Sequence, residues 1–174
     1  MNELDEVWTQ MMQDAIHKAR SSGRTDITEY LELKAGNDSV RAASCRWLFE
    51  SFTELSDEVN RRGIRLHIEN QNPHRFSVGH ATIVGSLIVF HHGLRNLTVE
   101  AGWTRTPQDG FIRGGGLACA RLTHFGMSRY NAELLLVRSA ESIPQWFSIT
   151  KEGRRNLISS NNLREHFNIF LDLH

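Results

Sequence analysis

The side chains of this 174-residue chain that could do chemistry are mainly its nine histidines, its arginines and a few carboxylates. Imidazole binds metals and transfers protons near neutral pH, so the adjacent His91 and His92 attract attention first. Successive side chains of a strand point to opposite faces, and two adjacent rings therefore cannot easily bind one ion. A metal site would need one of this pair with remote partners such as His74, His80 or His124, and the chain contains no HExxH or similar ligand spacing.

Arginine is the second source of chemistry, because its planar guanidinium is suited to contacts with anions. The basic residues comprise 17 Arg and 3 Lys. Lys plus Arg and Asp plus Glu are equal at 20, so no net field attracts nucleic acid or an anionic membrane. The composition therefore disfavours nucleic acid as a partner. The candidate ligand-binding residues are His91, His92, Arg113, Arg121 and His124.

The remaining patterns with a chemical precedent are incomplete. Gly114, Gly115 and Gly116 form a glycine run without the GK[ST] sequence of a phosphate-binding loop, so a bent or bulged strand is the preferred interpretation. Cys45 and Cys119 form no CxxC pair, which fits a reducing compartment. No GxSxG elbow is present. We therefore predict no catalytic residue, no metal ion and no cofactor, and the absence of a catalytic motif favours a non-enzymatic protein.

A β-hairpin over residues 84–103 positions several of these candidates. Two β-branched runs flank a turn at Gly93 and Leu94, which is typical of a two-residue type II′ turn. This register makes one face nearly all apolar, and it sets two glycines opposite each other at a place where the sheet can bend. The predicted pairs are Val84 with Trp103, Gly85 with Gly102, Ser86 with Ala101, Ile88 with Val99, Phe90 with Leu97 and His92 with Arg95.

The other elements follow from the change of hydrophobic period along the chain. Helical spacing predicts three helices before Gly63, with breaks near residues 21–23 and 36–39. Asn37, Asp38 and Ser39 are expected to cap the third of these helices. Alternation predicts a strand over 64–69, a loop over 70–73 and a long strand over 111–123. A last helix is expected after Asn162, with Asn162 as its cap and Glu165 as the capping partner. Its helical spacing predicts a buried stripe of Leu163, Phe167, Phe170 and Leu171.

These elements predict an α+β fold in which N-terminal helices precede an antiparallel β-meander of about five to seven strands and a C-terminal helix. The length suits a single domain over residues 1–174, with a helical segment 1–63, a sheet 64–159 and a closing helix 160–174. The acidic N-terminus and the lack of a long apolar run predict a cytoplasmic protein that does not enter a membrane.

Three functional hypotheses are compatible with this sequence. The first is a soluble, non-enzymatic binding or assembly module that forms a homo-oligomer, with Trp8, Met11 and Met12 as a suitable helical contact. The second is a small-ligand-binding or enzymatic pocket between sheet and helix that uses His and Arg side chains. The third is an arginine-lined nucleic-acid binder. The lack of a catalytic signature favours the first hypothesis.

Overall fold

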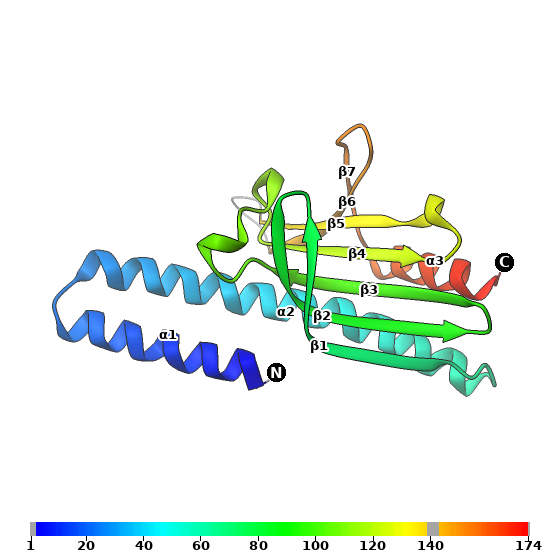
Figure 1. Cartoon of the computed structure of the whole chain (residues 1–174), viewed down its shortest axis with the longest axis horizontal. Helices are drawn as coiled ribbons and strands as arrows, with labels where there is room; N and C mark the ends of the chain where they lie inside the picture. The colour runs from blue at the N-terminus through cyan, green and yellow to red at the C-terminus, as the bar shows by residue number, and fades with distance from the viewer. Residues whose placement is uncertain (1–2, 139–142, 174) are drawn as a thin grey trace. The chain divides into compact units, whose positions relative to one another are not determined.

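The computed structural model describes residues 3–138 and 143–173 (Figure 1). Residues 1–2, 139–142 and 174, which belong to the predicted helical segment, sheet and closing helix, lie outside the described residues. In the described residues, all strands form one antiparallel sheet in chain order, between two N-terminal helices and one C-terminal helix. The predicted α+β meander is therefore confirmed. No helix in the described ranges has the length and apolar character needed to cross a membrane. The elements are α1 Glu3–Ser21, α2 Thr25–Arg61, β1 His67–Val78, β2 Ala81–His92, β3 Arg95–Trp103, β4 Ala118–His124, β5 Ala132–Val137, β6 Gln145–Ile149, β7 Arg155–Leu157 and α3 Ser160–Leu171.

The chain divides into two compact units, Met1–Ala42 and Ala43–His174. In the first unit, α1 and the start of α2 form an antiparallel helical hairpin. Trp8 donates a hydrogen bond from Nε1 to Asp38 Oδ2 at 3.0 Å, and Lys34 Nζ lies 5.0 Å from the centre of the Trp8 ring. Met12 is buried, so Trp8 and Met12 belong to the interior of the hairpin.

The predicted break near residues 36–39 is wrong, because α2 continues through it. A glycine inside a helix costs only about 1 kcal/mol, which neighbouring packing can offset. Asp38 resembles a helix cap in the sequence, but its carboxylate instead accepts hydrogen bonds from Trp8 and Arg41. The cap-like residue therefore joins the two helices instead of starting a new one.

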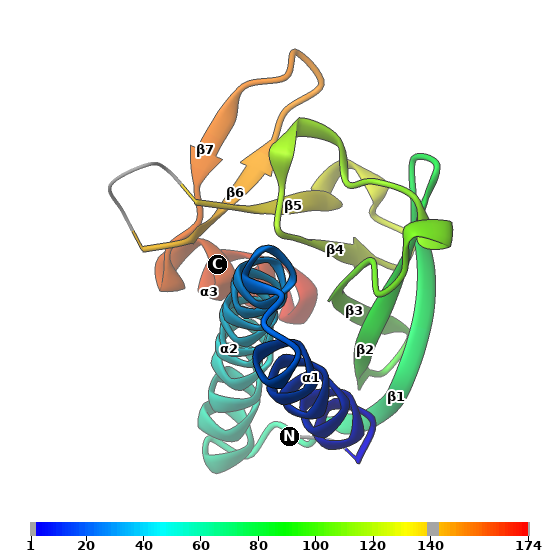
Figure 2. The same cartoon turned by 90° about the vertical axis from the view of Figure 1, so that its left-hand side faces the viewer.

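In the second unit, the sheet curves around the C-terminal part of α2 and around α3 (Figure 2). Phe52 of α2, Phe90 of β2 and Phe167 of α3 meet in the inner core, with ring centroids 5.5 to 6.4 Å apart. All three rings are almost fully buried. The predicted buried stripe of the last helix is confirmed at Leu163, Phe167, Phe170 and Leu171.

The predicted register of the β2–β3 hairpin is confirmed at every pair. Gly93 has a φ of 59°, and among the described residues other than glycine only Asp172 has a positive φ. Leu94 therefore has a negative φ, as the second position of a type II′ turn requires.

Gly85 and Gly102 pack backbone against backbone at the centre of this hairpin. A Cβ atom on Gly85 would lie 1.9 Å from the carbonyl oxygen of Ala101, and one on Gly102 would lie 2.4 Å from that of Val84. At this point β1 and β2 both bend, so that the C-terminal end of β1 and the N-terminal end of β2 leave the direction of the rest of the sheet (Figure 1). Their far ends cover the outer face of β4 and β5 and form a second hydrophobic core there, which contains Phe76, Ala81, Ile83, Cys119 and Leu135.

Three further predictions are corrected by the structure. The loop predicted over 70–73 is part of β1, which keeps pairing with β2 through an irregularity between Gln71 and His74. Residues 111–117 form no strand, because Gly114 and Gly115 have φ values of 76° and 70° and belong to a short 3-10 turn. The last helix is capped by Ser159, whose partner is Asn162, one turn earlier than expected.

We predict that Gly85→Ala destabilises the fold by about 3 kcal/mol or more, because the added Cβ meets rigid backbone. Gly36→Ala is the matched control: no atom lies within 4 Å of its added Cβ, so it should stabilise α2 by about 0.5 to 1 kcal/mol. Urea unfolding of the two variants measures both effects. Equal stability of Gly85→Ala and the wild type would show that the two strands do not approach this closely.

Candidate functional site

The structure places the five candidate ligand-binding residues in separate environments. His92 is exposed beside the β2–β3 turn, and Arg113 is exposed in the loop before β4. His91 lies on the outer sheet face, with Nε2 3.5 Å from Glu69 Oε1. Arg121 is on the outer face of β4, whereas His124 is buried on the inner face against α3. These five side chains are therefore not gathered in one pocket.

Arg121 belongs to a group of three residues, the Glu100 cluster, with His74 and Glu100. Glu100 is only 7% exposed. His74 Nε2 lies 2.7 Å from Glu100 Oε1, and Arg121 donates from Nε and Nη2 to Oε2 at 2.8 and 2.7 Å. The same guanidinium lies over the ring of Phe76 and donates to the carbonyl oxygen of Ser77 at 3.5 Å. A buried carboxylate is thus paired on both of its oxygens.

The Glu100 cluster connects the bent end of β1 to β3 and β4. A carboxylate that orients an imidazole is also part of many acid–base sites. Here, however, both carboxylate oxygens are engaged, and these three side chains do not line the polar pocket or the apolar groove described below. The role of the Glu100 cluster is best explained as structural: it holds the bent end of β1 against β3 and β4. Its pairs span 26 and 21 residues and depend on the bend, so local spacing could not reveal them.

A second polar contact connects the sheet to α3. His124 Nε2 and His166 Nδ1 are 3.0 Å apart with stacked rings, and one of them donates to the other. His124 Nδ1 is buried without a hydrogen-bond partner among the described residues. Burial lowers the pKa of His124 to about 4 and also lowers the pKa of His166. Both rings are therefore neutral at pH 7.

The cysteines have no reactive environment in the structure. Cys45 and Cys119 are both free and buried. Burial, assisted by the negative charge of Glu133, raises the pKa of the Cys119 thiol to about 12. The thiolate is the nucleophilic form, so Cys119 behaves as a small core residue.

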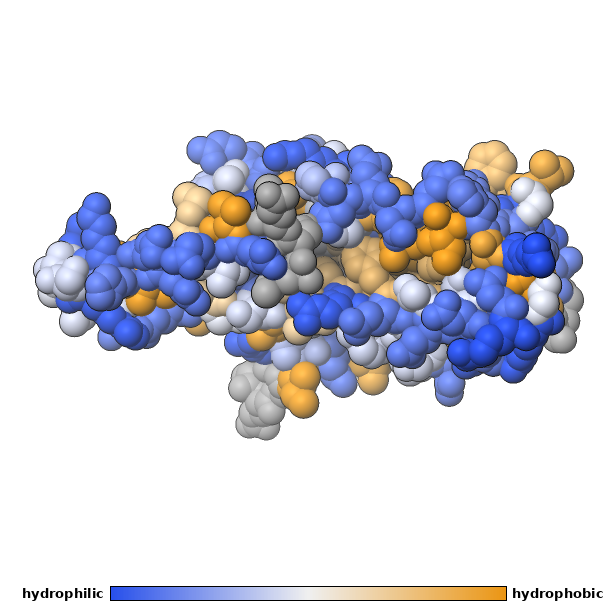
Figure 3. All heavy atoms as spheres, turned by 90° about the horizontal axis from the view of Figure 1, so that it is seen from below, coloured by the Kyte–Doolittle hydropathy of each residue, from blue (hydrophilic) through white to orange (hydrophobic). Residues whose placement is uncertain are grey.

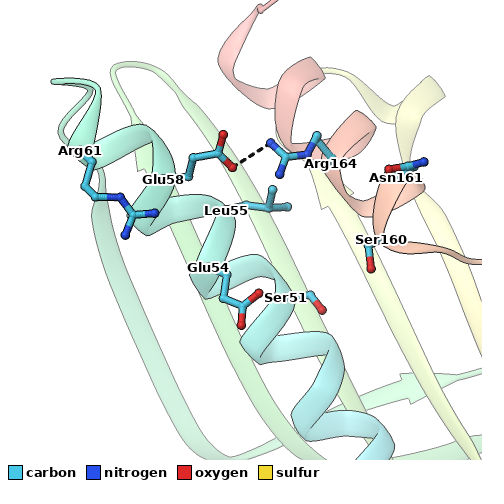
Figure 4. Close-up of a pocket in the computed structure, with 8 residues that line it drawn as sticks. All are labelled: Ser51, Glu54, Leu55, Glu58, Arg61, Ser160, Asn161 and Arg164. Atoms are coloured by element: carbon cyan, nitrogen blue, oxygen red, sulfur yellow. Dashed lines mark ion pairs between the residues drawn. The ribbon is translucent and has the colours of Figure 1, made fainter.

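A polar pocket of about 410 Å³ lies between α2 and the start of α3 (Figure 4). Arg164 of α3 reaches Glu58 of α2 at 2.8 Å, and this hydrogen bond lowers the pKa of Glu58. Glu54 and Arg61 also line the pocket. Two carboxylates and two guanidinium groups balance each other, so the pocket has no preference for an ion of either sign.

An apolar groove of about 380 Å³ lies between α2 and strands β6 and β7. Trp47, Ile143 and Leu157 are exposed at 38%, 83% and 50%, although all three are large apolar residues. Among the residues that the structure describes, no charged side chain lines the groove. The sequence did not indicate it, because it combines α2 with segments about 100 residues further along the chain.

The helical hairpin of the first unit also exposes apolar side chains. Val7 and Met11 of α1 are 56% and 61% exposed, and Tyr30 and Leu33 of α2 are 63% and 64% exposed. We call these four residues the hairpin face. Figure 3 shows hydrophobic side chains among hydrophilic ones on one side of the molecule, including the hairpin at its left.

We predict that Glu100→Gln destabilises the fold by about 3 kcal/mol, because it removes the charge that pairs with His74 and Arg121 in a buried position. Glu133→Gln is the control: it is opposite Arg121 on β5 but exposed, so the change should stay within about 0.5 kcal/mol. Denaturant unfolding at neutral pH distinguishes the two variants. A similar loss of stability in both variants would contradict the structural role of the Glu100 cluster.

We also predict that the free energy of unfolding falls as the pH falls from 6.5 towards 4. The folded pKa of His124 is below its ordinary value of 6.5, so the unfolded chain binds more protons than the folded chain in this window. The slope reaches at most about 1.4 kcal/mol per pH unit for each such histidine. In His124→Leu the decline should be shallower, whereas the exposed control His92→Asn should follow the wild type. Unfolding curves at several pH values test this, and parallel slopes in all three proteins would refute it.

Among the described residues, no group of three or more His, Cys, Asp or Glu side chains is arranged to hold a metal ion. Comparison with protein-family models, with curated proteins and with solved structures finds no match to this chain. A functional proposal must therefore come from the surfaces described above.

Proposed function

We propose that this protein is a non-enzymatic assembly module that self-associates through the hairpin face. The observation that supports the proposal is the exposure of four large apolar side chains, each more than half accessible, on one short helical hairpin. Scattered exposed apolar residues are ordinary, but a cluster of them is typical of an interaction surface.

Helix geometry places the four residues on the same side of the hairpin. Val7 and Met11 each directly precede a residue of the hairpin interior, Trp8 and Met12. On α2, Leu33 likewise directly precedes Lys34, which lies against the Trp8 ring, and Tyr30 precedes the partly buried Leu31. On either helix, the side chain of the preceding residue is rotated by about 100° around the helix axis. Since the two helices run antiparallel, this rotation leads to the same side on both.

The side of the hairpin that carries the hairpin face is large enough for a specific dimer. The 19 residues of α1 extend over about 28 Å, and two helices side by side are about 20 Å wide. The projected area is then about 560 Å² per copy, or about 1,100 Å² for two copies, which reaches the roughly 1,000 Å² expected of a specific interface. A two-fold pairing of such faces is isologous and would give a four-helix arrangement.

The two alternative functions, a ligand pocket that uses His and Arg side chains and an arginine-lined nucleic-acid binder, have less support than self-association. A pocket that uses His and Arg would need Arg121 and His124 on one face, but they lie on opposite faces of the sheet. An arginine-lined nucleic-acid surface would need uncompensated guanidinium groups, whereas Arg121 is paired with Glu100 and Arg164 with Glu58. Neither alternative has an observation of its own comparable to the hairpin face.

We predict a monomer–dimer equilibrium that Leu33→Glu and Met11→Glu weaken. Each substitution removes about 1 kcal/mol of apolar burial per copy and acts twice in a two-fold dimer, so each should raise the dissociation constant by about 30-fold. Sedimentation equilibrium over about 1 to 100 μM measures this constant.

Leu94→Glu is the matched control, because Leu94 is 95% exposed but lies in the β2–β3 turn of the other unit. It should dimerise like the wild type. Far-UV circular dichroism shows that all variants remain folded. A wild type that is strictly monomeric over the whole range, or a control that weakens association as much as Leu33→Glu, would refute the proposal.

A further inference from the structure

We infer that the apolar groove of the second unit is a binding site for a small uncharged molecule with an aromatic or branched aliphatic body. This site is separate from the hairpin face and does not depend on self-association. Its walls come from α2 on one side and from the segment around β6 and β7 on the other, and they include Ser44, Trp47, Ile143, Gln145, Trp146 and Leu157.

The size of the groove indicates a small ligand. Its volume of about 380 Å³ is near the lower end of the roughly 300 to 1,000 Å³ that small-molecule sites occupy. The adjacent sheet edge does not favour an extended peptide instead, because β7 has only three residues and offers a short backbone template.

The polarity of the lining indicates that the ligand carries no charge. None of the lining side chains in the ranges 3–138 and 143–173 is ionisable, so a charged group would lose its hydration without gaining a partner there. Trp146 donates from Nε1 to the carbonyl oxygen of Ser44 at 3.1 Å, so its polar atom is already satisfied and its ring can serve as apolar wall. The side chains of Ser44 and Gln145 remain as polar groups of the lining that could orient one ligand dipole.

The exposed residues of the groove favour occupation. Trp47, Ile143 and Leu157 keep large parts of their apolar surface in water. A bound apolar molecule would cover that surface, and each 100 Å² of apolar area removed from water is worth about 2.5 kcal/mol before the cost of association. The hydrogen bond from Trp146 to Ser44 connects the two walls directly.

The test is a titration with N-phenyl-1-naphthylamine, a neutral aromatic probe whose fluorescence rises in apolar sites. We expect saturable binding of one probe per chain and energy transfer from tryptophan. Ala43→Phe should fill the groove, and Leu157→Gln should remove an exposed wall, so each should weaken binding at least about 10-fold. Trp47→Phe should reduce the energy transfer while it preserves most of the binding.

Two controls separate the groove from other apolar surfaces. Leu94→Gln changes an exposed leucine outside the groove, and Leu33→Glu changes the hairpin face; both should bind the probe like the wild type. Loss of binding in Leu33→Glu with full binding in Ala43→Phe would place the probe on the hairpin face and overturn the inference. Absence of saturable binding to the wild type would also overturn it, as would equal binding by all variants. Circular dichroism confirms that each variant is folded.

Discussion

The close backbone contact between Gly85 and Gly102 is the constraint on which the second unit depends. Only residues without a Cβ permit two strands to approach this closely, and the bend at this place carries the far ends of β1 and β2 over the outer face of the sheet. The bend has two consequences. It creates the second hydrophobic core around Phe76 and Leu135, and it brings His74 to Glu100. A side chain at either glycine would therefore disturb packing and charge pairing together.

The edges of the sheet are poorly suited to pairing with another chain, which bears on how the protein could assemble. β7 has only three residues, and β1 is interrupted between Gln71 and His74. Short and irregular edge strands are common ways of preventing uncontrolled strand addition. Assembly through the sheet edge would meet this obstacle, whereas the hairpin face offers exposed apolar side chains on regular helices. The proposed association therefore uses helices and not the sheet edges.

The sequence predicted those features that depend on local periodicity. The β2–β3 register followed from strict alternation and a glycine turn, and the buried stripe of α3 followed from helical spacing. The predictions failed where the local conformation depends on a residue far away in the sequence. Asp38 accepts a hydrogen bond from Trp8 instead of capping a helix. β1 continues through Asn72 and Pro73, which suggested a loop, because it pairs with β2. The Glu100 cluster and the apolar groove could not be predicted, because they join residues that only the bent sheet brings together.

The polar contacts and the exposed apolar surfaces have different roles in this fold. In the described residues, the contacts of Glu100 with His74 and Arg121, of His124 with His166 and of Glu58 with Arg164 each connect one structural element to another. Glu58 and Arg164 also line the polar pocket, where two carboxylates and two guanidinium groups balance each other. The hairpin face and the groove, in contrast, expose apolar side chains. The removal of exposed apolar surface from water by a bound molecule is favourable in free energy. This is the physical basis of both proposals.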